Sequence, residues 1–174
     1  MKKWILVTGF FVFALFLCCS IPVFAATAIP SVLGYDLVDS GGHMDYCIGD
    51  TKYSSYIWGA TNTWNNYLGE KVIREDTAAT ITDCDIYDNY QPDVGWVART
   101  GDYGFCGAME LNPYYMDELS ATKILHVLKH EFGHTLGCDE NDCSDLNIMY
   151  PSVKSNSNLT IHDKASVDLA RDSW

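Results

Sequence analysis

The sequence of 174 residues predicts an α+β domain whose mixed sheet occupies the first two-thirds of the chain. Several short segments with a strand pattern lie before residue 113. Segments with apolar residues at helical spacing lie among these strand segments and after them. The composition, 48% hydrophobic and 20% charged, is that of a globular domain. Disordered and fibrous classes are therefore excluded, and the length predicts one domain.

The first 25 residues predict a secretory signal peptide. Lys2 and Lys3 precede an apolar run that ends at Leu17, and small residues follow around Ala25. A membrane anchor is the alternative, but the run is shorter than the roughly 20 residues that a span needs. We therefore expect cleavage after Ala25, secretion, and no membrane span in the mature chain.

The next boundary falls after a pair of glycines. Residues 26–42 predict a short pro-segment or N-terminal tail, and residues 43–174 predict the folded domain. Lys and Arg number 11 against 23 Asp and Glu, so the formal charge is −12 and becomes −14 once Lys2 and Lys3 are removed. Nucleic acid and anionic membranes require a basic face, so both are excluded as partners. We expect a monomer.

The first part of the domain combines one helix with five strand signals. The helix is predicted over Tyr53–Tyr67, where apolar residues recur at i, i+3 and i+4 spacing and Gly69 follows. The strand segments are short and partly alternating. They are predicted over 43–48, 71–74, 79–86, 94–99 and 109–112, with a glycine-rich loop over 100–107 before the last.

Two further helices complete the expected order. Ser120 can cap a helix that runs to about Leu136 and stops at Gly137. Thr160, followed by Asp163, is a plausible N-cap pair for a last helix that ends near Ala170. The segment between these helices has no regular pattern.

The long helix carries the sequence His130-Glu131-Phe132-Gly133-His134. Two histidines four residues apart lie on one helix face and can share a tetrahedral Zn²⁺. Glu131 is turned about 100° around the axis. It can therefore reach a water in the open coordination position without binding the metal itself. Zinc lowers the pKa of such a water, and the glutamate can take its proton.

The alternative interpretation is a helix with two structural histidines. The apolar backing face of the helix argues against it, and so does the glycine three residues after His134, which lets the chain turn back. A third ligand is then expected within the next few residues. Asp139, Glu140 and Asp142 are the candidates.

These residues resemble a known family. The pattern His130-Glu131-x-x-His134-x-x-Gly137-x-x-Glu140, followed by Asn147-Ile148-Met149-Tyr150-Pro151, is similar to the metzincin zinc endopeptidases, and most similar to the matrixins and their small bacterial relatives. The resemblance covers about residues 43–172, with specific motifs only in 130–151. Weaker likenesses lie at Thr63–Asn65 and Gly107–Asn112.

The resemblance implies a zincin-like fold with a mixed twisted sheet, an active-site helix, a methionine turn and a C-terminal helix. It implies that His130 and His134 bind zinc, that Glu131 is the general base and acid, and that Met149 packs below the metal. Tyr150 would support the reaction intermediate. The substrate-aligning edge strand would fall near 107–112, and the substrate would be a peptide or protein.

One position departs from the family. The third ligand there is His, or Asp in a minority, whereas this chain has Glu140. A carboxylate oxygen can ligate zinc, but its added negative charge should make the bound water less acidic. Asp139 is the rival ligand if the turn differs by one residue. The alternative function is therefore a catalytically impaired, secreted binding protein on the metzincin scaffold.

Five cysteines remain after signal cleavage, so at least one thiol is unpaired or joined to another chain. Cys138 and Cys143 flank the third-ligand loop and are a candidate disulfide that would hold Glu140 in place. Cys47, Cys84 and Cys106 would then supply one pair and one remainder.

Three minor expectations remain. The acidic stretch 83–93 and the loop 101–107 are candidates for Ca²⁺, although a solvated acidic loop is the simpler interpretation. Asp36 or Asp39 could reach the metal as a carboxylate latch. His126, one turn before His130, is expected to be a partly buried neutral histidine rather than a second partner of the site.

Overall fold

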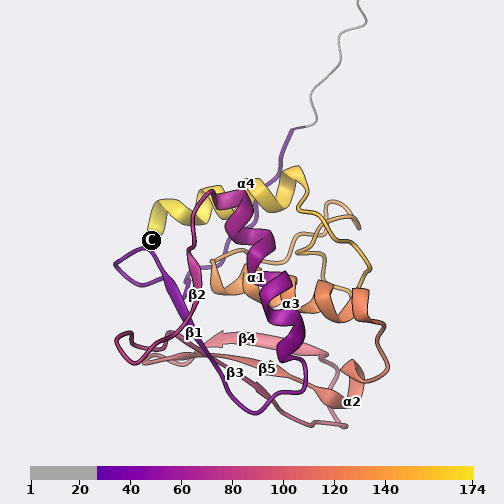
Figure 1. The fold of residues 1–174 in the computed structure, drawn as a ribbon. Helices are drawn as coiled ribbons and strands as arrows, with labels where there is room; N and C mark the ends of the chain where they lie inside the picture. Colours follow the sequence, from indigo (N-terminus) through magenta and orange to yellow (C-terminus); the bar gives the residue numbers. More distant parts are fainter. Residues whose placement is uncertain (1–26) are drawn as a thin grey trace, which may run out of the picture.

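A computed structural model describes residues 27–174, so the predicted signal peptide lies outside the described residues. The chain forms a five-stranded mixed sheet with helices on one face, which confirms the predicted α+β class. Figure 1 shows α1 and α3 on the same side of the sheet, with α4 beyond α3. None of the helices in the described region is long and apolar enough to cross a membrane.

The strand order in the sheet is β2-β1-β3-β5-β4. The first four strands in this order run parallel, and only β4 runs antiparallel to its neighbour. The bounds are β1 Met44–Ile48, β2 Ile73–Glu75, β3 Cys84–Asp88, β4 Ala98–Asp102 and β5 Gly107–Leu111. Each predicted strand segment thus contains or overlaps one strand.

Two predictions about the strands were wrong. The loop expected over 100–107 begins as strand, because β4 extends through Asp102 and pairs with β5 along its length. The edge position expected near 107–112 belongs instead to β4. β5 is paired with β3 on one side and with β4 on the other, so it lies inside the sheet. Arg99 of β4 and the buried Glu110 of β5 form an ion pair of 2.8 Å that fixes this register.

The helices bury the sheet's apolar face. α1 spans Ser54–Leu68 and ends at Gly69, whose φ of 74° is the left-handed conformation that glycine adopts without strain. α3 spans Ala121–Thr135 and packs against α1, and Trp64 of α1 donates from Nε1 to the Lys129 carbonyl at 2.8 Å. The core between sheet and helices includes Met44, Ile57, Ile86, Met109, Leu128 and Phe132.

The helix ends agree only in part with the sequence. Ser120 precedes α3, but its side chain makes no capping hydrogen bond. A four-residue helix, α2 Pro113–Met116, was not predicted, and it forms because Asn112 accepts from the Tyr114 N–H and proline suits the first turn. α4 spans Ile161–Ala170 and begins with the predicted pair, Thr160 and Asp163, as a complete capping box. A final 3₁₀ turn, η1, covers Arg171–Ser173.

Candidate metal centre

α3 presents its two histidines from one face. Ile124, Leu128 and Phe132 are buried on the opposite side of the helix and anchor it in the core. His130 and His134 lie one turn apart, with ring centroids separated by 4.6 Å and ring planes at 90°. Both side chains are nearly buried, at 13% and 14% exposed. The helix therefore fixes both rings before any ligand arrives.

Backbone carbonyls determine which nitrogen of each ring is free. His130 Nδ1 lies 2.9 Å from the Ile148 carbonyl, and His134 Nδ1 lies 2.8 Å from the Cys138 carbonyl. A carbonyl can only accept, so each Nδ1 carries the hydrogen and each Nε2 of a neutral ring keeps its lone pair. The two Nε2 atoms face each other at 3.0 Å. Two lone pairs at that distance repel unless a proton or a cation lies between them.

The chain then turns back to bring a carboxylate to the same point. Gly137 has a φ of 88°, and the Cys138 N–H returns to the Gly133 carbonyl at 2.9 Å, which ends the helix. Glu140 Oε1 lies 3.4 Å from His130 Nε2 and 3.9 Å from His134 Nε2. Asp139 does not join this group, because its Oδ1 accepts from the Glu140 N–H at 2.7 Å.

The three groups could together hold a zinc ion. Ligand atoms at two corners of a tetrahedron with bonds of 2.0–2.1 Å are about 3.3 Å apart. The distances of 3.0, 3.4 and 3.9 Å among His130, His134 and Glu140 bracket that value. Two imidazoles and one carboxylate would supply three ligands to such an ion and would leave a fourth position for water or substrate.

The local charges favour a positive species between these groups. Burial alone would lower the pKa of His130, but the hydrogen bond to Glu140 and the negative charges of Glu131 and Glu140 outweigh it and raise the pKa to about 9. Burial raises the pKa of Glu140, but the neighbouring histidines lower it by more, so the net shift is downward. Without a metal a proton takes this place, and a divalent cation would displace it.

Glu131 is held beside the metal centre rather than within it. Its side chain is buried, at 4% exposed, and it is not one of the three clustered ligands. Thr100 on the edge strand β4 donates from Oγ1 to Glu131 Oε2 at 2.8 Å. This contact fixes the carboxylate between the edge strand and the histidine pair.

Met149 packs against α3 at Gly133. It is fully buried, and its Sδ would stand 2.3 Å from a Cβ added to Gly133, the helix residue just before His134. The turn is anchored by Asp163 of α4, whose carboxylate accepts from the N–H groups of Ile148 and Met149 at 3.0 and 3.1 Å. Tyr150 follows the turn and lines a pocket with His130 and Glu131.

The predicted disulfide is absent, because all five cysteines of the described region are free. Cys138 is buried toward α4, where burial and the charges of Asp163 and Asp168 raise the pKa of its thiol. Cys143 is exposed and its Sγ lies 2.6 Å from Asn141 Oδ1. The two thiols therefore face different surroundings. Hydrogen bonds hold the ligand loop instead, including one of 2.7 Å from the Asn141 N–H to the Met149 carbonyl.

The segment before the domain packs against this loop. The N–H of Leu33 donates to the Gly137 carbonyl, and the N–H of Asp139 donates to the Ser31 carbonyl, at 2.8 and 3.0 Å. Neither latch candidate lies in the histidine cluster. Asp36 accepts from the Val38 N–H, and Asp39 accepts from the N–H groups of residues 41 and 43. Residues 29–39 thus belong to the fold rather than covering the candidate metal centre.

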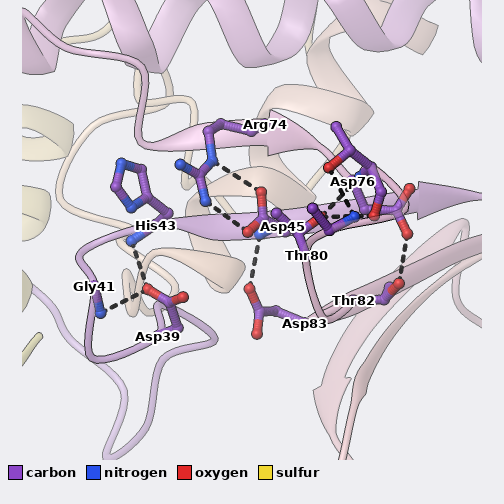
Figure 2. A network of polar contacts seen from close by, with 11 residues as sticks. Asp39, Gly41, His43, Asp45, Arg74, Asp76, Thr80, Thr82 and Asp83 are labelled. Atoms are coloured by element: carbon purple, nitrogen blue, oxygen red, sulfur yellow. Dashed lines mark hydrogen bonds and ion pairs between the residues drawn. The ribbon is translucent and has the colours of Figure 1, made fainter.

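A second group of acidic side chains lies at the far end of the sheet. Asp39, Asp45 and Asp83 bring carboxylate oxygens within 4.8 Å of one another (Figure 2). Arg74 holds both oxygens of the buried Asp45, at 2.8 and 2.6 Å, and the Asp45 N–H donates to Asp83 at 2.8 Å. Asp83 is the first residue of the acidic stretch expected to bind calcium, which stays a prediction.

Three contributors to the site were given no role there by the sequence. Asp163 was named only for the capping box, Asn147 only as part of the motif around Met149, and Thr100 carried no signal. Asn147 is fully buried and links the ligand loop to α4, because its side chain donates to the Asn141 carbonyl and accepts from Thr160.

Sequence comparisons add no family. No protein-family model and no curated protein matches this chain. One similar solved structure is described as the GM1-bound form of the ECX AB5 holotoxin, at 16% identity and a TM-score of 0.46. That match covers 74% of this chain and spans 64% of the other.

Proposed function

We propose that this protein is a secreted, zinc-dependent endopeptidase of the metzincin type. The observation that carries the proposal is the pair of lone-pair Nε2 atoms on His130 and His134, facing each other at 3.0 Å beside Glu140 Oε1. Zinc bound there would acidify a coordinated water and polarise a peptide carbonyl. The open fourth corner favours a catalytic over a structural site.

The reaction needs a base next to the open corner, and Glu131 is suited to that role. Its carboxylate takes the proton of the attacking water and passes it to the leaving amine. The Thr100 hydroxyl holds one carboxylate oxygen, so the other is left to accept the proton. Tyr150, which lines the same pocket, is suited to hydrogen-bond the oxygen of the attacked carbonyl.

The edge strand offers a way to align the substrate. Among residues 27–174, β4 pairs with β5 on one side only, so its other side presents backbone groups that no described strand pairs. An extended peptide can add to such an edge through main-chain hydrogen bonds. Because Thr100 of β4 contacts Glu131, a peptide on this edge would pass in front of the metal centre.

The test compares Glu131→Gln with Glu118→Gln, an exposed control. We expect both variants to bind one zinc per chain, measured by mass spectrometry of the metal. Casein cleavage should fall by about 10²–10⁴-fold in Glu131→Gln only, the range for loss of a general base. Full activity of Glu131→Gln, or failure of the mature chain to bind zinc, would contradict the proposal.

One observation favours a second function. Glu140 adds a negative charge to the ligand set, which weakens the metal as a Lewis acid. A metzincin-type binding protein that has lost turnover would bind zinc and peptide without cleaving it. Chelator-sensitive cleavage of casein by the unsubstituted protein distinguishes the two functions.

A further inference from the structure

A second pocket lies along β2, the edge of the sheet opposite to β4. It has a volume of about 550 Å³, within the range of small-molecule sites. One wall is a face of α1, and the other comes from residues between 69 and 75, which lead from α1 into β2. None of its described lining residues belongs to the pocket at the candidate metal centre. The two pockets are therefore separate sites.

The wall formed by α1 combines an aromatic surface with amides. Trp58, Asn62 and Asn66 line the pocket at intervals of four residues, so they follow one another along one helix face with a rise of about 6 Å per step. Trp58 is 74% exposed, which leaves an apolar indole face open to solvent. The wall thus presents one aromatic ring followed by two primary amides.

One further asparagine in this pocket already has partners. Asn65 donates from Nδ2 to the Ile73 carbonyl and accepts at Oδ1 from the Ile73 N–H, both at 2.9 Å, so its amide occupies the free edge of β2. By contrast, Asn62 and Asn66 make no side-chain hydrogen bond within residues 27–174. Each of these amides keeps two N–H donors and a carbonyl acceptor. They are available to a ligand that both donates and accepts.

The charges around the pocket largely cancel. Lys71 and Glu75 are exposed and have opposite signs, and Glu70 is ion-paired with Arg171. The whole chain has a formal charge of −12, so its long-range field repels an anionic ligand. The pocket therefore favours an uncharged ligand.

We propose that this pocket binds a neutral, linear oligosaccharide along α1, with one sugar ring stacked on Trp58. A sugar ring has a face of C–H groups that can pack on an indole, and a rim of hydroxyl groups that both donate and accept, as the amides of Asn62 and Asn66 do. A peptide would instead need apolar recesses for its side chains. Among the described lining residues, Trp58 is the only exposed apolar side chain.

Titration calorimetry of the chain without residues 1–25 tests the site with cellotetraose, maltotetraose, N-acetylchitotetraose and mannotetraose. We expect at least one to bind with a Kd of about 1 mM or lower. Trp58→Ala should weaken this binding at least about tenfold, and Trp58→Phe, which keeps an aromatic face, should retain part of it. Phe105→Ala is the control, because it removes a 93% exposed aromatic side chain outside the pocket. Its affinity should equal that of the unsubstituted chain.

The amides provide a second measurement. Asn62→Leu and Asn66→Leu should each weaken binding about two- to tenfold, because a sugar hydroxyl then loses its hydrogen-bond partner. Both side chains are at the surface of α1, and leucine suits a helix, so both variants should fold.

Three results would overturn the proposal. They are no saturable binding of any of these sugars up to about 10 mM, an unchanged affinity in Trp58→Ala, and tighter binding of sialyllactose, which is anionic. Sedimentation supplies a fourth, because a dimer that Trp58→Ala converts to a monomer would mean that a second copy of the chain occupies the pocket. Neither zinc nor casein cleavage enters this test, so its outcome is independent of the endopeptidase proposal.

Discussion

Two regions of this molecule each bring three candidate ligands within 4.8 Å of one another, yet their chemistry differs. In the histidine cluster, backbone carbonyls occupy the Nδ1 atoms of His130 and His134 and leave the Nε2 atoms facing each other. In the aspartate cluster (Figure 2), Arg74 and backbone N–H groups already hold the carboxylates.

The difference shows that proximity of acidic groups does not make a metal site. What matters is whether the protein itself already supplies the positive charge and the donors. Arg74 neutralises Asp45 directly, so a cation would have to displace a bidentate ion pair. In the described part of the chain no cationic side chain holds the two Nε2 atoms, and Glu140 adds negative charge beside them.

The largest effect should be a difference in zinc affinity when one candidate ligand is replaced in each cluster. His134→Ala should weaken zinc binding by more than the 10–100-fold that loss of an outer partner typically costs. Asp39→Asn keeps an oxygen for the N–H groups of residues 41 and 43, so zinc binding should not change. Competition with a fluorescent chelator measures both. Equal zinc affinity in the two variants would remove the distinction between the clusters.

Substitutions in the aspartate cluster should instead change the free energy of unfolding. Arg74→Met leaves the buried Asp45 carboxylate without its counter-ion, which should cost about 3 kcal/mol, the low end for a broken buried pair because Arg74 is 29% exposed. Adding Asp45→Leu should recover part of that loss. Urea unfolding measures both, with zinc affinity as the control. An unchanged unfolding midpoint would mean that the pair is not holding this end of the sheet.

Lowering the pH should destabilise the fold through His126. The pKa of His126 is lowered to about 4 by burial, against an ordinary value of 6.5. The unfolded state therefore takes up the proton first, so stability is present above pH 6.5 and is lost as the pH falls toward 4. The loss should reach about 2 kcal/mol by pH 5. Urea unfolding between pH 7.5 and 5 should show this loss of unfolding free energy in Arg74→Met, which keeps His126, and should not show it in His126→Leu. An equal dependence of the unfolding free energy on pH in the two variants would refute the role of His126.

The smallest effect should come from the packing of Met149 against α3. Gly133→Ala places a Cβ against the buried Met149 and Trp64. The strain, typically 1–3 kcal/mol, is partly offset by the better helix propensity of alanine, so the net loss should be about 1 kcal/mol. Gly59→Ala, whose only close neighbour is the flexible end of Leu125, is the matched control. Thermal melting compares them, and a stabilised Gly133→Ala would contradict the tight contact.

Local chemistry made much of the fold predictable. The spacing of apolar residues gave α1 and α3 within one or two residues, and Thr160 with Asp163 marked the start of α4. The sequence pattern predicted that His130, His134 and Glu140 lie close together, and the structure contains this cluster. These features depend on residues within about ten positions of one another.

Features that depend on distant partners were missed. The edge position of β4 follows from the pairing order of the sheet, which no single strand encodes. Thr100 meets Glu131 across 31 positions, and Asp163 reaches Ile148 across 15. The disulfide expected from the closeness of Cys138 and Cys143 in sequence failed because one side chain turned into the core and the other outward.

The leading segment has a practical consequence for recombinant work. The carbonyls of Ile29 and Ser31 accept from Asn141 and Asp139, which flank Glu140 on the ligand loop. A shortened protein starting at His43, where the sequence pattern suggests trimming, would discard both supports. Its metal content would then report on a loosened loop rather than on the native donor set, so samples for zinc titration should keep residues 29–42.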